Sequence, residues 1–221
     1  MKILVVAPHA DDEIIGVGGT IAKRIAEGAE VYVCIVTKGV SPIFTEKYMQ
    51  TLRNETFECH KKAGIKNTYF LEFPSVTLEK ESRYKINDAI YEVIREVLPD
   101  DIYIPHNGDM QRDHRIVAES TMVAARPKYD HKIKNIYAYE TLSETGWNIP
   151  NIQNEFIPNV YVNISDYMEQ KIKYMNCYKS QLNDFPNARS IEAIEALARF
   201  RGALMNVCAA EAFMLIRNLE L

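Results

Sequence analysis

Short apolar runs alternate with longer amphipathic stretches over the first two thirds of the chain. The apolar runs are rich in branched side chains and have the length of buried strands: 3–7, 31–37, 68–73, 101–105 and 136–139. Four stretches between them have helical periodicity: 13–27, 46–63, 84–97 and 113–125. Continuous apolar strands separated by helices are typical of a parallel sheet covered on both faces. The pattern predicts an α/β fold with a Rossmann-like, doubly wound, mostly parallel sheet.

The last third of the chain has a different pattern. The segment 143–158 contains Asn, Pro and Gly and is expected to be a long loop. An edge strand is predicted at 160–164, followed by helices at 167–178 and 191–216, with Ser190 as the N-cap of the second. We interpret this part as a helical C-terminal extension packed on the same unit, so that residues 1–221 form a single domain.

Composition and charge exclude several classes of protein. Hydrophobic residues make up 47% of the 221 positions, which suits an ordinary globular core. The net charge of −4 argues against a protein that neutralises a nucleic-acid backbone. No apolar stretch approaches the ~20 residues of a membrane helix, and the first one is too short for a signal peptide. The four cysteines are scattered, which favours reduced thiols and a cytoplasmic protein.

Two polar clusters follow directly after predicted strands. The first is 8–13 (Pro-His-Ala-Asp-Asp-Glu), and the second is 106–114 (His-Asn-Gly-Asp-Met-Gln-Arg-Asp-His). In the commonest doubly wound order the first and fourth strands lie side by side, and ligands bind in the crevice at their carboxyl ends. With that order, the two clusters would face each other.

The residue types in these clusters suit a metal ion. His9 and Asp12 can bind one ion from a single loop, and His114 would be a third ligand from the opposite loop. Two imidazoles and a carboxylate leave coordination positions open, as catalytic zinc sites do, and the same set also occurs around non-haem iron. Asp11 then remains as a carboxylate beside the metal that could deprotonate a water molecule.

Two other interpretations of the first cluster are possible. Residues 11–13 could simply stabilise the N-terminus of the following helix, but three carboxylates beside a histidine exceed what a cap needs. A dinucleotide site is disfavoured because Gly16, Gly18 and Gly19 do not fit GxGxxG, and because the acidic residues would repel a pyrophosphate. These glycines are better explained by close packing of the helix on the sheet.

The motifs resemble those of the PIG-L/LmbE-like deacetylase family. The resemblance lies in 7–13 with the glycines that follow, in 113–115, and in the Arg-Asn-Glu of 53–55. The C-terminal run from Arg189 to Phe213 is similar to the bacillithiol-biosynthetic branch of the family. The resemblance covers most of the chain, and the first motif is the more specific.

This resemblance implies N-deacetylation of an N-acetylglucosamine-type conjugate by a homo-oligomer that uses zinc or another divalent metal such as iron(II). The residues that match the family's metal ligands are His9, Asp12 and His114. Asp11 matches the general base, Arg53 a substrate-binding arginine, and Asp113 a residue that supports the neighbouring catalytic groups. Arg53 could equally be an ion-pair partner on a helix surface.

One position departs from the family pattern. Gln111 stands where the family usually has a histidine that helps to stabilise the oxyanion or serves as an acid. Glutamine can donate a hydrogen bond but cannot transfer a proton. Two alternatives therefore stay open: a non-catalytic sugar- or metal-binding homologue, and a hydrolase of another amide. The intact Asp11 argues against the first, because a binding protein needs no general base. A small sugar conjugate is the expected partner, with an acidic aglycone as one option.

Overall fold

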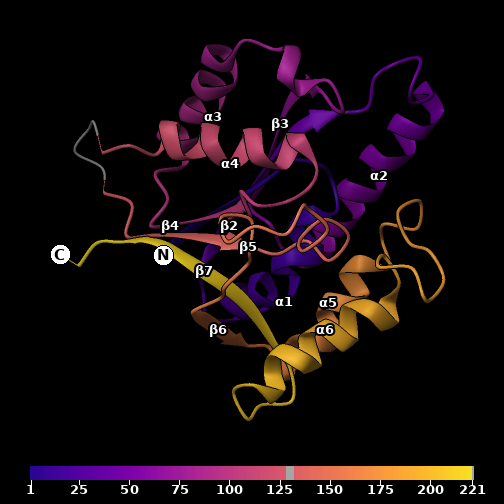
Figure 1. The fold of residues 1–221 in the computed structure, drawn as a ribbon, viewed down its shortest axis with the longest axis vertical. Coiled ribbons are helices and arrows are strands. Elements are labelled where there is room, and N and C mark those ends of the chain that lie inside the picture. The colour runs from indigo at the N-terminus through magenta and orange to yellow at the C-terminus, as the bar shows by residue number, and fades with distance from the viewer. Residues whose placement is uncertain (128–131, 221) are drawn as a thin grey trace.

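The computed structural model describes residues 1–127 and 132–220, and in them seven strands form one mixed sheet (Figure 1). The strands are β1 (Lys2–Ala7), β2 (Glu30–Lys38), β3 (Asn67–Pro74), β4 (Asp101–Pro105), β5 (Asn135–Tyr139), β6 (Val160–Asn163) and β7 (Ala210–Asn218). Their order across the sheet is β3-β2-β1-β4-β5-β7-β6. Strands β1 to β5 are parallel, and β7 is antiparallel to both of its neighbours. The predicted α/β class is confirmed.

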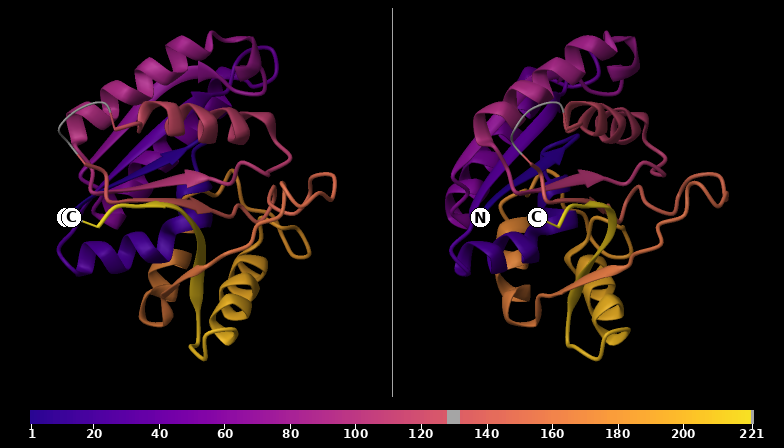
Figure 2. Two further views of the ribbon diagram at one scale, coloured as in Figure 1. Left: turned by 60° about the vertical axis from the view of Figure 1, so that its left-hand side comes forward. Right: turned by 90° about the vertical axis from the view of Figure 1, so that its left-hand side faces the viewer.

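Helices cover both faces of this sheet. They are α1 (Asp12–Ala26), α2 (Glu46–Ala63), α3 (Arg83–Val97), α4 (Arg112–Ala124), α5 (Met168–Met175) and α6 (Ile191–Ala203), with 3₁₀ turns at Leu78–Lys80 and Ser165–Tyr167. Helices α3 and α4 pack on one face, and α1, α2, α5 and α6 lie on the other (Figures 1 and 2). Each face has its own buried hydrophobic cluster. Among the described helices, none combines the length and the apolar character needed to cross a membrane.

The C-terminal extension differs from the prediction. The helix expected over 191–216 ends at Ala203, although Ser190 does cap its start by accepting a hydrogen bond from the Ala193 amide. The chain then turns and enters the sheet as β7, between β5 and β6. Its alanines and glutamate favour a helix locally, but pairing with two strands supplies backbone hydrogen bonds and burial that outweigh this propensity.

The glycines after the first polar cluster allow close packing, as predicted. A Cβ atom on Gly16 would lie 2.3 Å from the Tyr139 ring, and one on Gly19 would lie 2.6 Å from the Ile164 side chain. Helix α1 can therefore approach the sheet and the strand β6 region only without side chains at these two positions.

A buried ion pair joins α1, α5 and β7. The Lys171 ammonium lies 2.6 Å from Glu211 Oε1, and both side chains are 4% exposed. Lys171 also donates to the Ile15 carbonyl, while Glu211 accepts from the amides of Gly19 and Thr20. The pair is hydrogen-bonded on all sides, which is what makes a buried charge tolerable.

We expect Glu211→Gln to destabilise the protein strongly. The substitution keeps the shape of the side chain but leaves the Lys171 ammonium buried without a counter-charge, at a cost of about 3–5 kcal/mol. Urea denaturation would measure this loss. The control is Glu169→Gln, which removes an exposed partner of Lys173 and should leave the free energy of unfolding unchanged. Equal midpoints for the two variants would contradict the role assigned to the buried pair.

Candidate active site

The two polar clusters meet because β1 and β4 are neighbours. Ile3, Leu4 and Val5 pair in parallel with Asp101, Ile102 and Tyr103, as the expected strand order requires. Parallel strands bring their carboxyl ends to the same edge of the sheet, so the loops that follow them lie against each other. The predicted juxtaposition is therefore present.

Three predicted side chains surround one point at this edge. One ligand atom from each of His9, Asp12 and His114 can be chosen so that all lie within 4.8 Å of one another. His9 Nδ1 is 3.1 Å and His114 Nε2 is 3.3 Å from the same oxygen, Asp12 Oδ2. His9 comes from the loop after β1 and His114 from the first turn of α4, while helix α1 supplies the carboxylate from its first residue.

Each imidazole also contacts a second carboxylate, through the ring nitrogen that points away from Asp12. His9 Nε2 lies 3.0 Å from Asp113 Oδ2, and His114 Nδ1 lies 2.8 Å from Asp109 Oδ2. Such carboxylates fix the tautomer and orientation of metal-binding histidines. The opposite nitrogens, His9 Nδ1 and His114 Nε2, therefore face the cluster.

Unpartnered buried atoms show that these residues fit a cation. Asp12 Oδ1 and His114 Nε2 are buried and have no hydrogen-bond partner among the described residues. Buried polar atoms are normally satisfied, and a coordinated ion would satisfy both of these. Nitrogen and oxygen donors in this number suit zinc or another divalent transition metal.

Protons and a cation compete for the same ring nitrogens. Burial lowers the pKa of both imidazoles, but their carboxylate partners outweigh it and raise the pKa of His9 to about 9 and that of His114 to about 10. Burial acts to raise the pKa of Asp12, yet the two histidines hold it well below its usual range. Metal affinity should accordingly fall as the pH falls.

Asp11 lies beside this set in a strained backbone conformation. It is fully buried, and its φ of 108° lies in a region that non-glycine residues rarely adopt. Arg189, from the segment before α6, donates to Asp11 Oδ2 at 2.5 Å, whereas Oδ1 has no partner among the described residues. Burial raises the pKa of Asp11 to about 8, and the Arg189 charge opposes that shift.

A cavity of about 740 Å³ opens next to these residues. Asp11, Gln111 and Arg53 line it, and Gln111 Nε2 lies 3.4 Å from His9 Nε2. Arg53, on helix α2, forms an ion pair with Glu72. The structure thus brings six predicted site residues together, and Arg53 lies on the wall of the same cavity.

Asp109 and Arg189 were not assigned a role from the sequence. Asp109 belongs to the second cluster, and its spacing of five residues from His114 could have suggested it as the carboxylate behind that imidazole. Arg189 is 178 positions from Asp11, so only the tertiary structure reveals the contact.

His60 lies outside both polar clusters but is buried near the first of them. Its Nε2 is 3.0 Å from Glu13 Oε1, which also accepts a hydrogen bond from the Tyr178 hydroxyl at 2.5 Å. The buried Glu13 carboxylate needs both partners.

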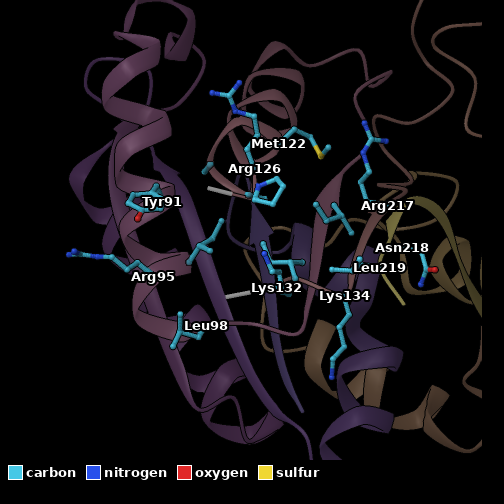
Figure 3. Close-up of a pocket in the computed structure, with 16 residues that line it drawn as sticks. Tyr91, Arg95, Leu98, Met122, Arg126, Lys132, Lys134, Arg217, Asn218 and Leu219 are labelled. Carbon is cyan, nitrogen blue, oxygen red and sulfur yellow. The ribbon is translucent and has the colours of Figure 1, made fainter. Parts of the chain in front are cut away.

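A second cavity, of about 450 Å³, lies at the opposite end of the sheet. Figure 3 shows the cationic side chains around it, which are those of Arg95, Arg126, Lys132, Lys134 and Arg217. Within the described residues, neither a carboxylate nor an imidazole lines this cavity. Among these residues it therefore has no histidine or carboxylate ligands for a metal ion, so the site near His9 is the candidate for metal-dependent catalysis.

A doubly wound sheet with two histidines and a carboxylate around one point, and a further carboxylate beside them, is typical of metal-dependent hydrolases. The sequence model of the PIG-L family, described as GlcNAc-PI de-N-acetylase, matches residues 4–125, more than half of the chain. The protein belongs to this family, which confirms the resemblance found in its motifs.

Individual relatives support the same assignment. The diacetylchitobiose deacetylase of Thermococcus kodakarensis is 27% identical over 202 residues, covering 81% of this chain and 70% of that protein. A probable N-acetyl-alpha-D-glucosaminyl L-malate deacetylase 2 of Bacillus cereus is 27% identical over 191 residues, covering 81% and 83%. The 4-carboxy-2-hydroxymuconate hydratase GalB of Pseudomonas putida has the same fold, with a TM-score of 0.80, 19% identity and coverage of 100% and 98%.

We expect Asp109→Asn to weaken zinc binding by about 10–100-fold, because the amide no longer supports the His114 ring as a carboxylate does. Calorimetric titration of metal-stripped protein would measure the affinity. Asp100→Asn is the matched control, since Asp100 pairs with Lys134 at the other end of the sheet and should not affect binding. Unchanged affinity in Asp109→Asn would rule out this supporting role.

Proposed function

We propose that this protein is a metal-dependent hydrolase that removes the N-acetyl group from an N-acetylglucosamine-type conjugate and releases acetate. Its family is described as GlcNAc-PI de-N-acetylase, and the two relatives are named as deacetylases of diacetylchitobiose and of N-acetyl-alpha-D-glucosaminyl L-malate. The observation that carries the proposal is the placement of Asp11. It is a buried carboxylate with one free oxygen, beside the cluster of His9, Asp12 and His114 and on the wall of a cavity that could hold a sugar.

The proposed metal ligands are His9, Asp12 and His114. A divalent cation held there would supply a Lewis acid and lower the pKa of a water molecule; zinc suits the ligand set, and iron(II) is the alternative. Asp113 and Asp109 would keep the two imidazoles in the required orientation.

Asp11 is the proposed general base. Arg189 occupies Oδ2, so the free Oδ1 is the oxygen that accepts the proton of the attacking water. The water oxygen forms the new bond to the acetyl carbon, the C–N bond breaks, and the proton held by Asp11 passes to the departing amine. The products are acetate and the free amino sugar. Gln111 would donate a neutral hydrogen bond to the carbonyl oxygen.

We further propose a cytoplasmic homo-oligomer formed from single-domain chains. The four cysteines are free, and three of them are buried. Both hydrophobic clusters use strands of the same sheet, which favours one domain. Trp147, Ile149 and Ile152, all at least 76% exposed, form an apolar group on the long loop after β5 that a second copy could cover.

Acetate release from a panel of N-acetyl sugars tests the proposed activity directly. Metal-stripped protein should be inactive and should recover with zinc. Asp11→Asn should lower kcat by roughly 10²–10⁴ while it still binds zinc, because only the base is lost. Asp12→Asn should instead lose zinc affinity. Full turnover by thoroughly stripped protein would refute the metal requirement, and an active Asp11→Asn variant would place the base elsewhere.

Gln111 should contribute to transition-state stabilisation without titrating. We expect Gln111→Ala to cost about 1–3 kcal/mol in kcat/KM, the effect of one neutral donor lost from a partly buried site. Gln111→His should add an ionisation to the pH profile of kcat/KM. Gln153→Ala, on an exposed loop position, is the control. A silent Gln111→Ala would mean that this side chain does not face the reacting carbonyl.

A further inference from the structure

One carboxylate on the cavity wall, that of Glu72, pairs with two cations. Glu72 Oε2 lies 2.7 Å from the Lys38 ammonium, and Glu72 Oε1 forms an ion pair with Arg53. The Arg53 guanidinium also lies 3.6 Å from the centre of the Phe70 ring. All four residues line the cavity that contains Asp11. Lys38 and Arg53 could bind an anionic group of a substrate, but both are already paired with the Glu72 carboxylate.

The backbone places Glu72 there through a β-bulge in an edge strand. Ile35 of β2 pairs with Phe70 of β3, but Thr37 pairs with Phe73, so that β3 has one extra residue between these pairs. Glu72 lies in this bulge with a φ of 63°, a conformation that glycine adopts most easily. Bulges commonly redirect side chains next to active sites. A strained glutamate in place of glycine indicates that its carboxylate is used.

The carboxylate changes what this part of the cavity can bind. Without Glu72, Lys38 and Arg53 would present two positive charges and a guanidinium able to grip a carboxylate through two hydrogen bonds. With Glu72, both cations have a partner, and an incoming carboxylate would meet a like charge. A hydroxyl group can still donate to the Glu72 oxygens, which are 40% exposed as a side chain.

We infer that Glu72 is a specificity-determining residue that makes the cavity prefer an uncharged, hydroxyl-bearing aglycone, such as a second sugar, over a carboxylate-bearing one. The inference rests on the proposed deacetylation and is the opposite of the acidic aglycone expected from sequence. It places Arg53 in a group whose charge Glu72 lowers from +2 to +1.

Two probes of opposite character test it: N,N'-diacetylchitobiose, which is neutral, and N-acetylglucosaminyl malate, which is anionic. Wild-type kcat/KM should favour the neutral probe. Glu72→Gln should raise kcat/KM for the malate conjugate about tenfold, mainly through a lower KM, because a like charge is removed from a binding contact. The neutral probe should change by less than about threefold. Glu169→Gln, an exposed glutamate paired with Lys173, is the control.

A wild-type preference for the malate conjugate, or an unchanged ratio in Glu72→Gln, would overturn the inference. Circular dichroism would establish that the variant is folded. The affinities of the two deacetylated products, measured by calorimetry, give a readout that needs no turnover. Absence of acetate release from both probes would count against the proposed function, whereas the ratio of product affinities in wild type and Glu72→Gln would still decide the role of Glu72.

Discussion

The structure depends on the burial of five carboxylates at the point where β1 and β4 end. Asp11, Asp12, Glu13, Asp109 and Asp113 are each no more than 1% exposed. A buried carboxylate is very costly unless it is paired and hydrogen-bonded. The residues around this cluster supply the hydrogen bonds and opposite charges that make its burial possible. They come from both the N-terminal and the C-terminal parts of the chain.

This constraint explains why the C-terminal third packs where it does. Residues 4–125, the part that matches the family, supply all five carboxylates and the imidazoles of His9, His60 and His114. The segments after residue 175 supply the Tyr178 hydroxyl for Glu13 and the Arg189 guanidinium for Asp11. The extension thus contributes to the proposed active site, since it provides the cation that contacts the proposed base.

The sequence predicted those features that are local. Strands β1 to β5, helices α1 to α4 and the pairing of β1 with β4 follow from hydrophobic periodicity and the commonest order of such sheets. The meeting of His9, Asp12 and His114 follows from two short clusters. The strand β7 could not be predicted in this way, because its alanines and glutamate favour a helix until two neighbouring strands are present. The contact of Arg189 with Asp11 and the bulge at Glu72 also depend on tertiary structure.

The fold by itself does not determine the reaction, since GalB, a hydratase by name, has the same fold at a TM-score of 0.80. Backbone strain is concentrated on the cavity wall. Five non-glycine residues have positive φ within the described residues, and three of them, Asp11, Glu72 and Val76, line this cavity.

Each of the three strained residues places a polar group. Asp11 presents its carboxylate beside the metal-ligand set, and Glu72 directs its carboxylate to Lys38 and Arg53. Val76, a branched residue for which this conformation is especially unfavourable, turns its amide to donate to Asp113 Oδ2 at 2.8 Å. Asp113 in turn holds His9. Strain that the rest of the fold must offset is thus concentrated in the groups that we propose to hold a ligand, act as the base and select a substrate, which is where a functional constraint would keep it.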